Sequence, residues 1–129
     1  MQRKLVAVYG TLKRGEGNYG VTQACGAEFI GTAHTIHHYS MYGGWGFPRV
    51  TKDKQVCPIQ VEVFEVDNFE AMDHLEGHPN FFRREQIPVA LDEPNNEEVV
   101  NMAWMYFHPS IGEGQMDSIV EDGLWRNRS

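Results

Sequence analysis

The sequence predicts an α+β protein: a small mixed, mainly antiparallel β-barrel with flanking short helices. Segments with the composition or alternation of β-strands outnumber the one clear helix signature. Most connections between these segments are too short for the crossovers that join parallel strands. The chain has 129 residues, of which 41% are hydrophobic. One core fits this size and composition, so we expect a single domain over residues 1–129.

Three strands are predicted in the first part of the chain. Residues 5–9 are a short apolar, β-branched run that ends at Gly10, which is typical of a buried strand. Residues 28–42 are rich in Thr, His, Ile and Tyr and predict one extended strand. Residues 59–66 alternate apolar and polar side chains for most of their length, as a half-buried strand does.

Glycine-rich stretches predict the loops between these strands. Residues 10–20 contain four glycines and predict a long loop that leads into a short helix near residues 18–25. A second glycine-rich stretch, residues 43–48, ends the strand before it.

Two more strands are predicted in the second half of the chain. They cover residues 82–91 and 99–107, and the polar turn 92–96 separates them. The tail, residues 112–129, reads mostly as loop, with Trp125 as an aromatic anchor. Trp104 and Tyr106 share one face of their strand, and we expect both to pack in a core.

The clear helix signature covers residues 67–77. Asp67 is a candidate N-cap, and Glu70 stands three residues later, as in a capping box. Gly77 suits the left-handed position after a helix, and Pro79 follows as a stop signal.

One acidic residue of this helix lies on its apolar side. On a helical wheel with about 100° per residue, Glu76 falls between Phe69 and Met72, and Ala71 and Leu75 complete the apolar arc. Glu76 also lies in the last turn, where the helix dipole repels a carboxylate. Both effects raise a carboxyl pKa and make Glu76 a candidate general acid/base. The alternative is a helix that frays at Leu75, with Glu76 in solvent or bonded to a nearby amide.

Charge and cysteine content exclude several classes of protein. Eleven Lys and Arg against eighteen Asp and Glu give a net charge of -7, and no basic patch for nucleic acid is visible. No apolar run reaches the length of a membrane span or a signal peptide, so we expect a cytoplasmic protein that does not act on membranes. Cys25 and Cys57 are expected to be reduced, buried thiols.

Two further groups of polar residues have a functional and an ordinary interpretation. Lys13 and Arg14 lie among glycines, but the stretch lacks the ending and spacing of a phosphate loop. The ordinary interpretation of this stretch is a solvated loop. The functional interpretation is that Arg14 steers a substrate carboxylate. The histidines could suggest a metal site, but alternating residues across a helix end do not share a face, and we expect no metal. These histidines are His34, His37, His38, His74 and His78.

Two segments resemble signatures of one family. Residues 8–15, VYGTLKRG, are similar to the YGTL-type loop of the gamma-glutamylcyclotransferase-like (AIG2-like) family. Residues 72–79, MDHLEGHP, followed by Phe82 and Arg84, resemble the second signature of that family. Weaker likenesses extend the resemblance over most of the chain, at residues 47–48, 62–66, 99–106 and 123–125.

The resemblance implies a barrel with a cavity at one end and no metal or cofactor. Members of the family release 5-oxoproline and a free amine or peptide from a small γ-glutamyl substrate. The resemblance places the catalytic glutamate at Glu76 and a loop that cradles the substrate at Tyr9, Gly10, Thr11 and Leu12. The short chain looks closer to the γ-glutamylamine branch than to the larger glutathione-specific enzymes.

Departures from the family pattern concern the substrate more than the reaction. Phe82 stands where the family has Tyr, and Pro58 and Val61 are unexpected. The aromatic, glycine-rich insertion at residues 42–46 adjoins the expected pocket mouth. Two alternatives stay open: a non-catalytic small-molecule-binding module with the same pocket, and an enzyme of this fold acting on another γ-glutamyl or amide substrate.

Overall fold

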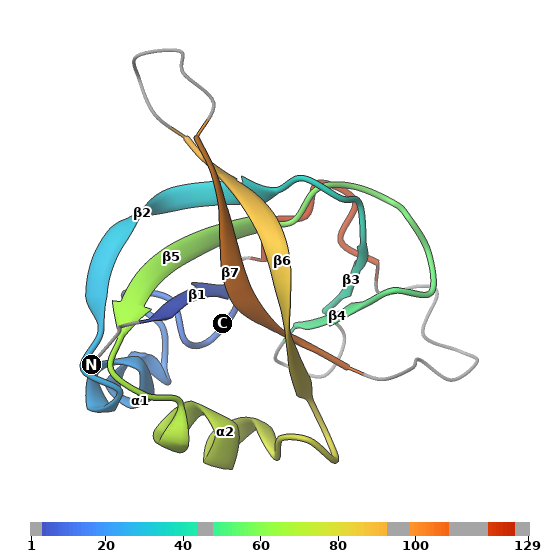
Figure 1. Cartoon of the computed structure of the whole chain (residues 1–129). Coiled ribbons are helices and arrows are strands. Elements are labelled where there is room, and N and C mark those ends of the chain that lie inside the picture. The colour runs from blue at the N-terminus through green and yellow to red at the C-terminus, as the bar shows by residue number, and fades with distance from the viewer. Residues whose placement is uncertain (1–3, 44–47, 93–98, 109–118, 126–129) are drawn as a thin grey trace.

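The structure is a computed structural model that describes residues 4–43, 48–92, 99–108 and 119–125. Five strands close into a barrel, and two short helices lie together on one side of it (Figure 1). In barrel order the strands are β1 (Lys4–Val8), β5 (Gln60–Val66), β2 (Glu28–Thr35), β6 (Arg83–Leu91) and β7 (Val99–Phe107).

The barrel is mixed and mainly antiparallel, as the sequence predicts. The pairs β1–β5, β5–β2, β2–β6 and β6–β7 are antiparallel. The barrel closes where β1 runs parallel to β7, with Val6 opposite Trp104. The segment that leads into the predicted substrate loop is therefore held between two strands from later parts of the chain.

The alternation of side chains along β1 divides the core into two parts. Ala7 and Tyr9 belong to the cluster inside the barrel, together with Val63, Val89 and Met105 from other strands. Val6 and Val8 point the other way, into a second cluster beneath the helices. That second cluster also contains Cys25, Phe64, Met72, Phe82 and Tyr106.

The single strand predicted over residues 28–42 is wrong. β2 ends at Thr35, and the chain turns before a short β3 (Ser40–Tyr42), which pairs with β4 (Arg49–Thr51) in a separate two-stranded sheet. Thr35 stabilises the break, because its buried hydroxyl donates to the His37 carbonyl (2.7 Å) and accepts from the Ile59 amide (2.9 Å). The β-branched composition of residues 28–42 does not reveal that the Thr35 side chain bonds to the backbone and so competes with strand pairing.

The helix signature is correct at its end and wrong at its start. α2 (Glu70–Glu76) ends at Gly77, whose φ of 66° is the predicted left-handed conformation. Its N-cap is Phe69, not Asp67, so the predicted capping box does not form. Asn68 Oδ1 instead accepts a hydrogen bond from the Glu70 amide at 3.0 Å.

The other predicted elements are confirmed where the structure describes them. α1 (Tyr19–Ala24) lies within the predicted helix, and both late strands form with nearly the predicted bounds. Trp125 is a buried anchor, and Cys25 and Cys57 are buried free thiols. The insertion at 44–46, Phe47, most of the turn 92–96 and much of the tail lie outside the described residues. Among the described helices, none has the length and apolar character needed to cross a membrane.

Candidate active site

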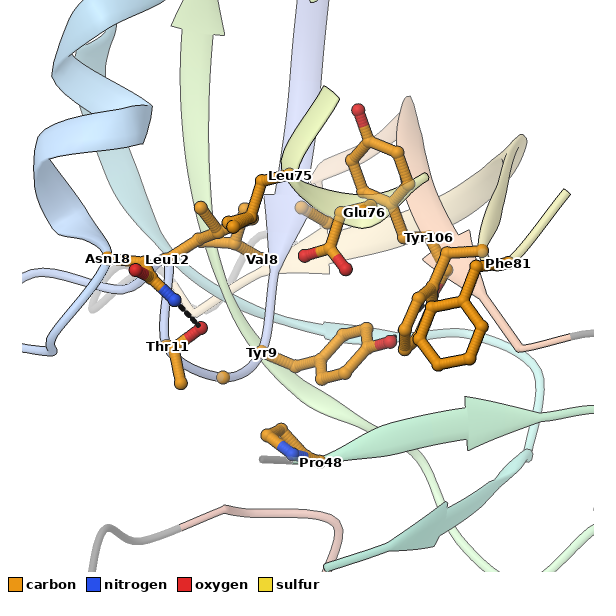
Figure 2. A pocket seen from close by; sticks show the side chains of 13 residues that line it. Val8, Tyr9, Thr11, Leu12, Asn18, Pro48, Leu75, Glu76, Phe81 and Tyr106 are labelled. Atoms are coloured by element: carbon orange, nitrogen blue, oxygen red, sulfur yellow. Dashed lines mark hydrogen bonds between the residues drawn. The ribbon is translucent and has the colours of Figure 1, made fainter. Parts of the chain in front are cut away.

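A cavity of about 320 Å³ lies between the end of β1, the loop after it, and the C-terminal end of α2 (Figure 2). Its volume is at the small end of ligand pockets and fits a small chemical group or molecule. All five predicted site residues line it, namely Tyr9, Gly10, Thr11, Leu12 and Glu76. The other lining residues are Ala7, Val8, Asn18, Pro48, Leu75, Phe81, Phe82 and Tyr106.

Hydrogen bonds from α1 and the residue before it fix the loop that follows β1. The Asn18 side chain donates to Thr11 Oγ1 at 2.9 Å (Figure 2). The Asn18 backbone amide donates to the Thr11 carbonyl, also at 2.9 Å. Thr22 Oγ1 donates to the Leu12 carbonyl at 2.7 Å. The loop conformation is therefore set before any ligand arrives.

The backbone N–H groups of this loop are candidate donors to a ligand. Within the described part of the chain, the backbone N–H groups of Gly10, Thr11 and Leu12 donate to no protein acceptor. These three residues line the cavity. Backbone N–H groups gathered in a turn form a concave cluster that binds anions.

Gly10 is required by a close approach of Pro48. A Cβ atom added to Gly10 would lie 2.3 Å from Pro48 Cγ and 2.7 Å from Pro48 Cδ. A proline ring cannot rotate away from such a contact, so any larger residue displaces either the loop or Pro48.

Replacing Gly10 by Ala is expected to destabilise the protein by about 1–3 kcal/mol, the usual cost of overpacking. Urea unfolding of Gly10→Ala measures this change. Gly17→Ala is the matched control, because a Cβ atom at Gly17 meets nothing within 4 Å. Equal stability of the two variants would show that the contact between Gly10 and Pro48 is not tight.

Tyr9 is both a core residue and a wall of the cavity. Its hydroxyl donates to the Tyr106 carbonyl at 2.7 Å, and the whole side chain is buried. Burial raises the Tyr9 pKa far above its ordinary value, with the Glu76 charge as a smaller cause. The hydroxyl therefore stays neutral and keeps the ring in place beneath the cavity.

Glu76 directs its carboxylate into the cavity, above the Tyr9 ring (Figure 2). α2 continues through Glu76, so the alternative in which the helix frays at Leu75 is wrong. Burial raises the Glu76 pKa from 4.5 to about 7, in the direction that the helical wheel predicts. A carboxyl group with this pKa can accept and return a proton near neutral pH.

Leu75 differs from its predicted place on the buried arc of the helix. It lines the cavity while remaining 41% exposed, and the helix ends one residue later. Phe81, Pro48 and Asn18 also line the cavity, and sequence reasoning did not identify them as site residues. No local pattern marks them, since each reaches the cavity through the folding of its loop.

A polar cluster anchors α2 to the barrel. Arg84 binds both oxygens of Asp73, with Nε to Oδ1 at 3.0 Å and Nη2 to Oδ2 at 3.1 Å. The Tyr106 hydroxyl donates to Asp73 Oδ1 at 2.6 Å. The Arg84 guanidinium also lies over the rings of Phe69 and Trp104. Arg84 is thus a structural partner for a carboxylate, and the cluster holds the helix one turn before Glu76.

The remaining candidates lie away from the cavity. Arg14 contacts Glu62 through its backbone amide (2.9 Å) and Nε (3.4 Å), and its guanidinium lies over the Phe29 ring. Lys13 Nζ donates to the Trp125 carbonyl at 3.1 Å. Neither side chain lines the cavity, so neither is placed to contact a ligand there. The described residues include no group of three or more His, Cys, Asp or Glu side chains able to hold a metal ion.

Comparisons with known proteins show which proteins this chain resembles. Residues 6–127 match the family described as "Gamma-glutamyl cyclotransferase, AIG2-like". A protein of Methanocaldococcus jannaschii named "Putative gamma-glutamylcyclotransferase" is 36% identical over 124 residues, which cover 95% of each chain. The "Gamma-glutamylaminecyclotransferase B" of Danio rerio is 33% identical over 79% of this chain and 58% of its own.

Solved structures show the same fold. The crystal structure of an AIG2-like protein from mouse superposes with a TM-score of 0.81 at 20% identity, over 98% of this chain and 90% of the mouse chain. The match to the family model covers nearly the entire sequence, from β1 to the residues after Trp125. The chain therefore belongs to the gamma-glutamyl cyclotransferase, AIG2-like family.

Proposed function

We propose that this protein is an intramolecular cyclotransferase that releases 5-oxoproline and a free amine or peptide from a γ-glutamyl substrate, with Glu76 as general acid/base. The observation that carries the proposal is the Glu76 carboxyl group, which has a pKa of about 7 and faces the loop after β1 across a small cavity. Membership of the family and the names of the relatives support the reaction type.

The proposed reaction conserves protons and needs no external reagent. Glu76 accepts a proton from the α-ammonium of the glutamyl group, and the free α-amine attacks the side-chain γ-carbonyl carbon. A new C–N bond closes the five-membered ring, and the bond to the leaving amine breaks. Two protons leave the attacking nitrogen in all, and two reach the leaving nitrogen. Glu76 carries them one at a time, which its pKa near neutrality favours.

The loop after β1 suits the anionic parts of the substrate. In this proposal the backbone N–H groups of Gly10, Thr11 and Leu12, which line the cavity, bind the α-carboxylate or the oxyanion that forms at the γ-carbonyl. The Tyr9 ring and Pro48 limit the space below Glu76. A glutamyl chain held bent in this space brings its own amine to its carbonyl, and such positioning supplies much of the acceleration of intramolecular reactions.

Mass-spectrometric detection of 5-oxoproline from a panel of γ-glutamyl amines and peptides tests the proposal. We expect product from at least one small γ-glutamyl compound, together with one equivalent of the released amine. A folded protein that forms no 5-oxoproline from any panel member would contradict the reaction and favour the non-catalytic binding module. Ligand-induced shifts in melting temperature would then identify what the cavity binds.

The reaction is expected to depend on pH through Glu76. Below pH 7 the carboxyl group is increasingly protonated and cannot accept the substrate proton, since its pKa is about 7. kcat/KM should therefore fall about tenfold per pH unit on the acid side, and it should rise toward a plateau or maximum above pH 7. Initial rates of 5-oxoproline formation between pH 5 and 8 measure the profile. A midpoint near 4.5, the ordinary glutamate value, would show that burial does not tune this group.

A further inference from the structure

We propose that Phe81 selects the leaving group, and that it receives an uncharged, apolar substituent on the leaving amine. The inference rests on the proposed cyclotransferase function and adds the substrate class. Phe81 is an aromatic residue that lines the cavity and is 45% exposed. It has no role in the reaction proposed above.

The two exposed side chains of the cavity mark its mouth. Leu75 and Phe81 are the only described lining residues whose side chains are largely exposed, at 41% and 45%. They lie on opposite sides of the Glu76 carboxylate (Figure 2). The glutamyl head must reach Glu76 and the loop after β1, so the leaving amine extends from the reacting carbonyl toward this apolar mouth.

Phe81 is fixed in place despite its exposure. Its ring packs edge-on against Phe82 (5.0 Å between centroids, 82° between planes) and against His108 (5.2 Å, 87°). Its backbone amide donates to the Gly77 carbonyl at 2.8 Å, which ties it to the end of α2. An aromatic side chain held this way offers a preformed apolar surface, which costs little entropy when a ligand binds.

The cavity lacks a cation for an acidic leaving group. Among the described residues, no Lys or Arg lines it, and Glu76 is its only carboxylate. Of the basic side chains nearby, Lys13 binds the Trp125 carbonyl, Arg14 binds Glu62 and Arg84 binds Asp73. Arg49 is fully buried and interacts electrostatically with Tyr9 and Tyr42, so it offers no exposed cation at the mouth. The chain as a whole carries a net charge of -7.

These charges disfavour a substituent that ends in a carboxylate. Such a group would approach the Glu76 anion without a counter-ion and would lose part of its hydration against Leu75 and Phe81. An alkyl or aryl substituent instead binds more tightly when it is buried against Leu75 and Phe81, because apolar surface leaves water. The structure thus favours γ-glutamyl derivatives of apolar amines over γ-glutamyl peptides with a free carboxylate.

Three γ-glutamyl amides of equal chain length separate these possibilities. The amines are butylamine, 4-aminobutyrate and 1,4-diaminobutane, which end in a methyl, a carboxylate and an ammonium group. We expect the native protein to convert the butylamide with a kcat/KM at least about tenfold above that of the carboxylate compound, as one apolar contact in a pocket provides. In the Phe81→Arg variant the ratio of kcat/KM for the butylamide to that for the carboxylate compound should fall, or drop below one, because the new cation pairs with the carboxylate.

Control variants make the result specific to the mouth of the cavity. Met102→Arg adds the same charge at a 52% exposed apolar position of β7 outside the cavity, and it should keep the native ratio. Phe81→Ala removes the ring without adding charge and should lower kcat/KM for the butylamide while leaving the carboxylate compound nearly unchanged. It also tests the inference if the arginine variant folds poorly.

The outcomes distinguish the two proposals. Product from all compounds with the carboxylate or ammonium substrate preferred would overturn the role of Phe81 and leave the cyclotransferase function standing. The same conclusion follows if Phe81→Arg and Met102→Arg give equal ratios. No 5-oxoproline from any of the three amides or from γ-glutamyl peptides would overturn both proposals.

Discussion

The Glu76→Gln variant is expected to lose between about a hundredfold and ten-thousandfold in kcat, the usual contribution of one general acid/base. Glutamine has the shape of glutamate but cannot exchange protons, so the α-amine keeps its proton and the leaving amine receives none. KM should change little, because the substrate contacts of the loop after β1 remain. Steady-state formation of 5-oxoproline measures both constants.

Glu70→Gln is the matched control for this variant. Glu70 lies in the first turn of the same helix, is exposed and does not line the cavity. Its replacement should leave kcat within about twofold of the native value, as expected for a surface position. Native turnover in Glu76→Gln would remove Glu76 from the mechanism, whatever the preferred substrate is.

The Arg84→Met variant is expected to destabilise the fold by about 2–3 kcal/mol and to lower kcat as well. Removing the guanidinium takes away two charge-assisted hydrogen bonds and leaves the partly buried Asp73 carboxylate with the Tyr106 hydroxyl alone. α2 then loses its anchor one turn before Glu76. Urea unfolding gives the stability change, and 5-oxoproline formation gives the effect on turnover.

Two further variants show whether this loss comes from the pair itself. Arg83→Met removes a neighbouring but exposed arginine of β6 and should change stability by less than about 0.5 kcal/mol. In the double variant Asp73→Asn with Arg84→Met, the loss should be smaller than the sum of the two single losses, since each single change already breaks the pair. Strict additivity would mean that Asp73 and Arg84 stabilise the protein independently.

The sequence predicts those parts of the site that depend on local geometry. The helical period alone places Glu76 on the apolar side of α2, and burial there raises its pKa as expected. The run from residue 5 to Gly10 predicts a strand followed by a turn, and the turn lies at the cavity. The barrel follows from strand alternation and short connections, which limit the possible pairings.

Features that depend on distant contacts are not visible in the sequence. The break after Thr35 needs the amide of Ile59, and Gly10 is constrained by Pro48. β4 has only three residues and follows a glycine-rich stretch, so no periodicity identifies it. Phe81 stands beside a turn, and only the folded chain shows that it lines the cavity.

The parallel pairing of β1 with β7 also affects how the protein is made. A ribosome releases the loop after β1 early, but that loop follows a strand whose two neighbours, β5 and β7, come much later in the chain. Long-range pairings of this kind form late, because their loop-closure entropy must be overcome first. A nascent chain that ends before residue 99 has no closed barrel and no assembled cavity. Cyclotransferase turnover would therefore serve as an assay for completed folding of newly synthesised chains.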